Sequence, residues 1–186
     1  MKLIFSLCLL FMFCMDAIGQ PTFNTIYDHD KGIDVSYFSV DDTLNDRYFT
    51  TTKARTGNVD SLILVQSDYE GNIHHIYTYS DSGFYWLPEN ILLLRDTLLV
   101  LTGTVYNPST TDYNPFVGWF SIPGKKFTIR YYPFGFGIEG AKKIRLSHDN
   151  GFFVAALTQT FSNRDAQHYF LKIDSTGQKE WELIHG

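Results

Sequence analysis

A repeat of 53 residues constrains the fold of this chain more than any other feature of its sequence. Three glycines of tight turns, Gly71, Gly124 and Gly177, follow one another at steps of 53 residues. Two aspartates, Asp112 and Asp165, are separated by the same step. A regular period of this order is typical of solenoids and propellers, so the repeat predicts copies of one supersecondary unit.

Each copy divides into four short strands, marked by alternating side chains, by β-branched and aromatic residues, and by turn residues between them. The third copy predicts strands at 142–147, 151–160, 168–174 and 179–186. The second copy predicts strands at 90–95, 97–106, 116–122 and 126–132. The second strand of each copy is almost continuously apolar, which is typical of a strand covered on both faces.

The predicted fold class is all-β. Three four-stranded antiparallel units without helical periodicity predict three blades of a β-propeller, and a β-sandwich is the alternative. Propellers usually close with roughly four to eight blades. Three blades therefore predict an incomplete ring, which further blades of a longer chain or a second copy in a homodimer would close.

Residues 1–19 have the three zones of a secretory signal peptide. A basic residue, Lys2, precedes a short apolar run, and a polar stretch with small residues follows. Cleavage is predicted between Gly19 and Gln20, so the expected localisation is secreted or at the cell surface. The rest of the chain is expected to divide into an N-terminal lead at 20–32 and blades at 33–87, 88–139 and 140–186.

Composition narrows the chemistry that such a protein can carry. Both cysteines, Cys8 and Cys14, lie in the predicted signal peptide, so the exported chain would have no disulfide, thiolate metal site or cysteine nucleophile. A net charge of -5 without a basic cluster argues against nucleic acid as a partner. The apolar run is too short to span a membrane, so no membrane insertion is expected.

The third copy carries a set of motifs that occur together in one protein family. The set consists of Gly151-Phe152, Asp165, Lys172-Ile173-Asp174, Gly177 and Trp181. It resembles the propeller repeats of large secreted bacterial proteins, which often end in a type IX secretion sorting domain. The resemblance implies a β-propeller fold and export by the type IX route.

Binding residues are expected on the face of the ring that carries the long loops. In a four-stranded blade, the loop between the second and third strands lies on the same face as the loop to the next blade. Long loops on a rigid scaffold commonly carry binding residues. The candidate ligand-binding residues are Tyr85, Trp86, Tyr113, Phe134, Phe136 and Arg164. Packing between blades is the alternative for Trp86 and Phe134.

The predicted function is that of a secreted or cell-surface propeller module that binds a glycan or a protein without catalysis. Two alternatives stay open. A carbohydrate-active hydrolase or lyase would use loop carboxylates as acid and base, and those available are Asp81, Asp112, Glu139 and Asp165. A structural spacer of a larger surface protein would use no such site.

No cofactor and no metal site are predicted. The glycines at 135–140 match a dinucleotide-binding pattern, but that pattern requires a helix after it, and a strand is expected there. Asp28 and Asp30 are similar to the start of a calcium loop. The later ligands of such a loop are missing, so a solvated turn is the favoured interpretation.

Overall fold

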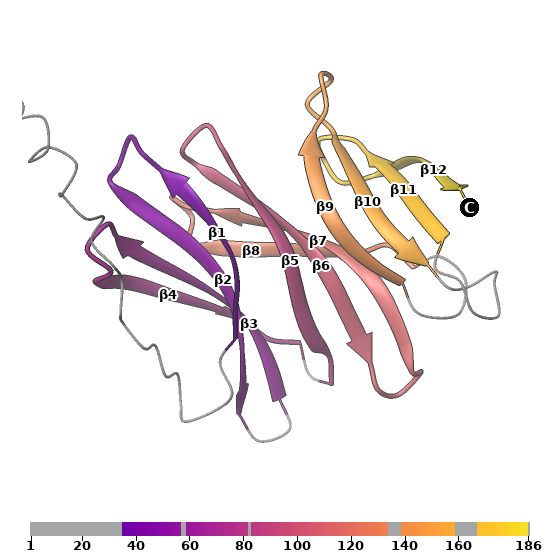
Figure 1. Ribbon diagram of the computed structural model, residues 1–186, viewed down its shortest axis with the longest axis horizontal. Helices are drawn as coiled ribbons and strands as arrows, with labels where there is room; N and C mark the ends of the chain where they lie inside the picture. The colour runs from indigo at the N-terminus through magenta and orange to yellow at the C-terminus, as the bar shows by residue number, and fades with distance from the viewer. Residues whose placement is uncertain (1–34, 57–58, 82, 134–138, 159–166, 186) are drawn as a thin grey trace, which may run out of the picture.

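The computed structural model describes residues 35–56, 59–81, 83–133, 139–158 and 167–185. Within these ranges the chain forms three four-stranded antiparallel sheets and no helix (Figure 1). None of the described segments is therefore a helix that could cross a membrane. The predicted all-β class with three four-stranded units is confirmed, and the described sheets do not close into a ring.

Each sheet is made of consecutive strands. The first contains β1 (Val35–Asp42), β2 (Arg47–Thr56), β3 (Val59–Asp68) and β4 (Ile73–Tyr79). The second contains β5 (Tyr85–Leu94), β6 (Leu98–Asn107), β7 (Asp112–Ser121) and β8 (Lys126–Tyr131). The third contains β9 (Glu139–Leu146), β10 (Phe152–Thr158), β11 (Gln167–Ile173) and β12 (Lys179–His185). The first strand of each sheet forms one edge and the fourth strand forms the other.

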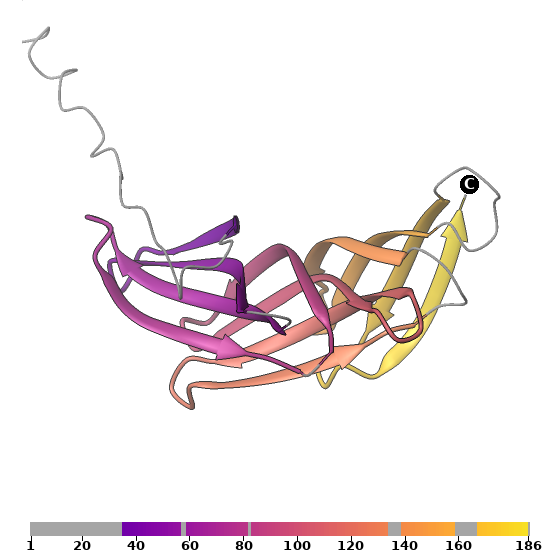
Figure 2. The same ribbon diagram turned by 90° about the horizontal axis from the view of Figure 1, so that it is seen from below.

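The three sheets follow one another along an open arc (Figure 2). β5 packs against β1, and β9 packs against β5, so the first strands of the sheets are neighbours. Two polar contacts join β5 to β9. Nζ of Lys142 donates to Oε1 of Glu89, and the backbone N of Ile144 donates to Oδ1 of Asn90 at 3.2 Å. Blades of a propeller are arranged in the same way around their axis.

Apolar side chains fill the two boundaries between neighbouring sheets. The boundary of the first and second sheets contains Phe49, Leu62, Leu64, Trp86, Ile91, Leu99, Leu101, Val105, Phe116 and Phe120. The boundary of the second and third contains Val100, Val117, Tyr132, Ala141, Ile144, Phe152, Val154, Ala156, Tyr169, Leu171 and Ile173. Successive side chains of a strand point to opposite faces, so β6 supplies Leu99 to one boundary and Val100 to the other. This explains its continuous apolar run.

The turn glycines are not equivalent in all copies. Gly177 has a φ of 82°, and its N donates to the backbone O of Asp174 at 3.0 Å. In the second copy Ser121 stands in the place of this aspartate, and its Oγ accepts a hydrogen bond from the N of Gly124 at 3.1 Å. The positive φ then falls on Lys125, at 50°. The step of 53 residues is therefore kept while the turn geometry changes.

Two of the second-to-third-strand loops predicted to be long, at 55–60 and 107–115, are short connections between strands that extend into those ranges. β2 and β3 pair as far as Thr56 and Val59, and β6 and β7 pair as far as Asn107 and Asp112. The expected length of these loops is therefore wrong. Polar residues at the strand ends continue the backbone hydrogen bonding beyond the apolar core, which the side-chain pattern does not reveal.

The face of the third sheet that points away from the second carries three exposed aromatic side chains beside the exposed cations Lys143 and Arg145. Phe153, Phe170 and Trp181 have exposed fractions of 41%, 37% and 44%. The rings of Phe153 and Trp181 are 5.7 Å apart. Val100 and Val117 stand one repeat step before the two phenylalanines and are fully buried by the third sheet. The equivalent positions are thus buried in the second copy and exposed in the third.

Candidate functional site

Three tyrosines form a row across one end of the second sheet. Tyr85 is the first residue of β5, Tyr106 lies near the end of β6, and Tyr113 lies near the start of β7. The strand register places Tyr106 opposite both of the others. The ring centroids of Tyr85 and Tyr106 are 5.7 Å apart, and those of Tyr106 and Tyr113 are 4.5 Å apart. We call these three residues the tyrosine ladder.

A cation from the first sheet extends the tyrosine ladder. Cζ of Arg55, at the end of β2, lies 5.2 Å from the ring centroid of Tyr85. A guanidinium over a tyrosine ring is attracted by the negative face of that ring. The side chain of Arg55 is 48% exposed, so its charge is also open to solvent. Four planar groups therefore follow one another across two sheets, with Arg55 at one end and Tyr113 at the other.

A buried carboxylate accompanies Arg55. Asp60 stands opposite Arg55 in the β2–β3 register, and its Oδ1 lies 3.6 Å from Nε of Arg55. Asp60 is only 4% exposed, and its Oδ1 has no hydrogen-bond partner among the described residues. Burial raises the pKa of the Asp60 carboxyl, while the charges of Arg55 and Lys53 oppose this shift. Asp60 thus helps to position the guanidinium and depends on it for charge compensation.

At the other end of the tyrosine ladder, no described strand pairs with β7 beside Tyr113. β8 pairs with β7 only from Phe116 onward, where Phe116 stands opposite Tyr131. No described strand therefore flanks Tyr113 on the side away from Tyr106. Tyr106 is also the only described ring in contact with Tyr113. The arrangement offers phenol hydroxyls, a guanidinium and a terminal ring with one described ring neighbour, which suit stacking and hydrogen bonding with a sugar or a protein side chain.

Trp86, which the sequence places among the ligand-binding residues, belongs to the core. It is fully buried, and its ring meets those of Tyr79 and Phe116 edge-on, at 5.3 and 5.2 Å between centroids. Tyr85 and Trp86 are neighbours in β5 and so point to opposite faces of the sheet. The prediction that Trp86 binds a ligand is therefore corrected, and packing between blades is what the structure shows.

The structure brings two of the predicted residues together, because Tyr106 lies between Tyr85 and Tyr113. The predicted residues that fall outside the described ranges are Phe134, Phe136 and Arg164, together with Asp28 and Asp30 of the calcium-like segment. Sequence reasoning missed Tyr106 and Arg55. Tyr106 and Tyr113 are equally distant from the β6–β7 connection, so they pair across the hairpin. This equal spacing was the sequence signal that could have identified Tyr106.

The carboxylates considered for catalysis are spread over different elements. Oδ2 of Asp81 accepts a hydrogen bond from the hydroxyl of Tyr131 at 3.1 Å, and Asp112 begins β7. The side chain of Glu139 and all of Asp165 lie outside the described part of the chain. Among the residues that the structure describes, no three His, Cys, Asp or Glu side chains gather into a group that could hold a metal ion.

No protein-family profile matches the sequence, and a search of curated proteins finds no match. Solved structures with partial similarity include two mutants of the Synechocystis apocarotenoid oxygenase and an ACO/RPE65 chimera. Each aligns with a TM-score of 0.47 and 10% identity over 74% of this chain and 35% of the other. The chain thus spans about a third of these structures, and we draw no functional conclusion from a likeness of this size.

Proposed function

We propose that this chain is a propeller module of a secreted or cell-surface protein and that it binds a glycan through the tyrosine ladder, without catalysis. A protein partner is the alternative ligand. The observation that supports the proposal most directly is the stack of Arg55, Tyr85, Tyr106 and Tyr113. The predicted signal peptide at 1–19 and the resemblance to type IX-exported repeats support the proposed location.

A stack of planar groups favours a ligand that is itself a ring. One face of a pyranose ring carries C–H groups that pack on an aromatic ring, while its hydroxyls reach the neighbouring polar groups. A sugar on the face of the Tyr113 ring that points away from Tyr106 would extend the stack that begins at Arg55. Each pair of stacked aromatic rings is worth about 0.5–1.5 kcal/mol beyond its buried area, so the ladder is also a rigid platform.

The proposal is tested by screening the full chain against an array of neutral and acidic oligosaccharides and titrating the best binder. Tyr113→Ala should weaken its binding by at least about tenfold, or about 1.4 kcal/mol. Tyr69→Ala is the matched control, because Tyr69 follows β3 and its hydroxyl donates to Asp41 instead. Equal binding by both variants would refute the ladder as the site. A captured protein whose binding needs Tyr113 would support the alternative ligand.

The open face of the third sheet supports a proposal about assembly. Phe153 and Phe170 occupy the positions at which Val100 and Val117 are buried by the next sheet. We propose that another blade covers this face, in a second copy of the chain or in a further repeat. Sedimentation of the chain at rising concentration tests the first form. Phe153→Lys should abolish any dimer that forms through this face.

A further inference from the structure

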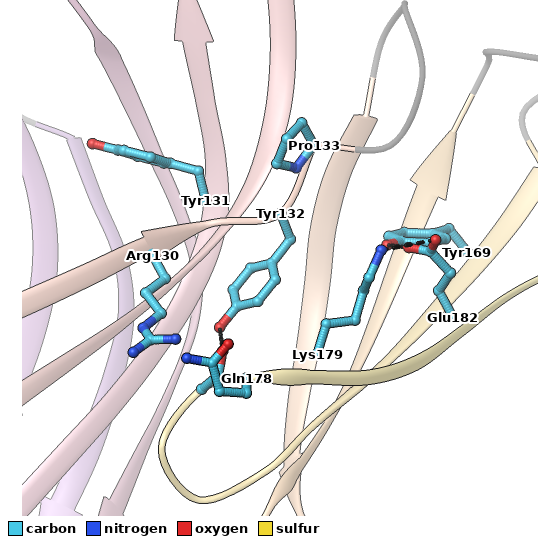
Figure 3. A pocket seen from close by; sticks show the side chains of 9 residues that line it. Arg130, Tyr131, Tyr132, Pro133, Tyr169, Gln178, Lys179 and Glu182 are labelled. Carbon is cyan, nitrogen blue, oxygen red and sulfur yellow. Dashed lines mark hydrogen bonds and ion pairs between the residues drawn. The ribbon is translucent and has the colours of Figure 1, made fainter.

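A hollow of 440 Å³ lies between the second and third sheets and shares no lining residue with the tyrosine ladder (Figure 3). The end of β8 forms one wall, and the turn before β12 with the first residues of β12 forms the other. Sites for small ligands commonly have volumes of about 300–1,000 Å³. The hollow is therefore large enough for a ligand of the size of one or two sugar rings.

The ring of Tyr132 forms part of the wall of the hollow, between two polar groups (Figure 3). Tyr132 is 7% exposed, and its hydroxyl donates to the backbone O of Gly177 at 2.7 Å, which joins the second sheet to the third. Burial raises the pKa of Tyr132, so its hydroxyl stays protonated and keeps this hydrogen bond. The ring separates two polar groups in Figure 3, with Arg130 and Gln178 on one side.

Lys179 and Glu182 lie on the other side of the Tyr132 ring, and their charges compensate each other. Nζ of Lys179 donates to Oε1 of Glu182 at 2.9 Å. The hydroxyl of Tyr169, a fully buried residue, donates to Oε2 of the same carboxylate at 2.9 Å. The charge of Glu182 is therefore paired with that of Lys179, and Figure 3 shows this carboxylate across the Tyr132 ring from Arg130.

Arg130 is the charged side chain of the hollow that has no ion pair among the described residues. Arg130 is the penultimate residue of β8, Tyr132 directly follows that strand, and Figure 3 shows the guanidinium on the Gln178 side of the Tyr132 ring. The residue is only partly exposed, and it forms no ion pair with any carboxylate of the described residues. A guanidinium that has lost part of its water gains from a hydrogen-bonded anionic partner. An anionic ligand would supply that partner.

We propose that this hollow binds an acidic sugar, with its carboxylate on the guanidinium of Arg130. The planar fork of an arginine matches a carboxylate with two parallel hydrogen bonds. The amide of Gln178 lies on the same side of Tyr132 as Arg130, where it can bind a hydroxyl group of the same sugar. A carboxylate with hydroxyls around a compact ring is the ligand chemistry that this distribution favours. The site is independent of the function proposed for the tyrosine ladder.

The test is a calorimetric titration of the full chain with D-glucuronate, D-glucose and inorganic phosphate at constant ionic strength. D-glucuronate should bind at least tenfold more tightly than either of the other two. Arg130→Gln should reduce the affinity for D-glucuronate to that for D-glucose, and Arg130→Lys should restore part of the difference, because it returns the charge without the fork.

Arg145→Gln is the matched control, because Arg145 is an exposed arginine of β9 without an ion pair to any described residue. It makes the same change of charge outside the hollow and should leave the affinity for D-glucuronate unchanged. Thermal unfolding of each variant confirms that it is folded. The proposal is overturned if D-glucuronate does not bind, if D-glucose or phosphate binds equally well, or if both glutamine variants have the same effect.

Discussion

The ammonium group of Lys172 donates a hydrogen bond to Oδ2 of Asp149, and the two atoms are 2.8 Å apart. The same group donates to Oε2 of Glu180 at 2.8 Å and to the backbone O of Ile173 at 3.2 Å. A lysine ammonium has three donors, and here three acceptors receive them. The side chain is only 4% exposed. Lys172 is thus a nearly buried cation that ties β11 to the turn before β10 and to β12.

Replacing this lysine should destabilise the fold. Lys172→Met keeps much of the side-chain length but leaves two carboxylates without their shared cation. We expect the free energy of unfolding to fall by about 1.5–3 kcal/mol, the range for hydrogen bonds to charged groups. Urea denaturation measures the change. Lys143→Met, at an exposed lysine of β9, is the control and should stay within about 0.5 kcal/mol of the wild type. Equal losses would contradict a special role for Lys172.

The same contact should make stability depend on acid pH. The hydrogen bond from Lys172, followed by one from the backbone N of Gly151, holds the pKa of Asp149 well below its ordinary value of 3.8. A carboxyl with a lower pKa in the folded state adds stability above its unfolded-state pKa and loses it as the pH falls through the folded-state pKa. Asp149→Asn should therefore cost stability at neutral pH, and the difference from the wild type should shrink below about pH 4. A difference that persists unchanged at low pH would argue against this origin.

Trp86 should be essential for the boundary of the first and second sheets. Trp86→Ala removes a fully buried ring and should cost about 3–5 kcal/mol of unfolding free energy. Trp86→Phe should cost much less, because Nε1 of Trp86 has no hydrogen-bond partner in the described part of the chain. Chemical denaturation of both variants gives the comparison. A loss below about 1 kcal/mol for the alanine variant would mean that the boundary repacks.

Asp60→Asn should stabilise the protein at neutral pH. Burial raises the pKa of Asp60, so keeping this carboxyl ionised costs free energy that the partly exposed Arg55 offsets only in part. A raised folded-state pKa means that stability falls as the pH rises through it. The variant should therefore gain roughly 1 kcal/mol at pH 7 and lose this advantage in acid. Thermal unfolding of the variant and the wild type at pH 7 and at acid pH gives the sign of the stability difference. A variant that is less stable than the wild type at pH 7 would show that the Arg55 contact outweighs the cost of burying the carboxylate.

Alanine substitutions at two glycines with similar backbone angles distinguish the cost of backbone strain from the cost of steric contact. Gly177 and Gly83 have φ of 82° and 90°. A Cβ on Gly177 would lie 2.6 Å from the ring of Trp119, whereas one on Gly83 would meet nothing within 4 Å. Gly83→Ala should cost about 1–2 kcal/mol for the left-handed backbone alone. Gly177→Ala should cost about 1–3 kcal/mol more, because the ring must move. Equal losses in urea denaturation would show that the ring adapts freely.

The sequence predicted the sheets well because the repeat lies in the turns and the apolar strands. Gly124 and Gly177 mark the connections before β8 and β12, and the apolar residues of β6 and β10 mark the buried strands. The first copy was less regular, because β2 begins 51 residues before β6, while β3 begins 53 residues before β7. The connection between β2 and β3 is shorter than the connection between β6 and β7, and this difference changes the spacing. Side-chain patterns locate the ends of strands poorly, so they do not reveal such a difference.

The sequence predicted only part of the candidate site. Tyr85 and Tyr113 interrupt the repeat and could be singled out, but Tyr106 ends an apolar strand and looked like part of it. Its role depends on the cross-strand register, which pairs it with both of the others. Trp86 was misplaced for the same reason, because a shift of one residue along a strand moves a side chain to the opposite face.

The second sheet is the only one of the three with a buried boundary on each of its faces in the described part of the chain. In a stack of similar units, stability is approximately the sum of the units and of the interfaces between neighbours. Three units share two interfaces here, so deleting the third repeat would remove a third of the units but half of the interfaces, and would expose Val100 and Val117. A shortened chain should therefore lose stability out of proportion to its length, and loss of the middle blade would leave the other two without a neighbour.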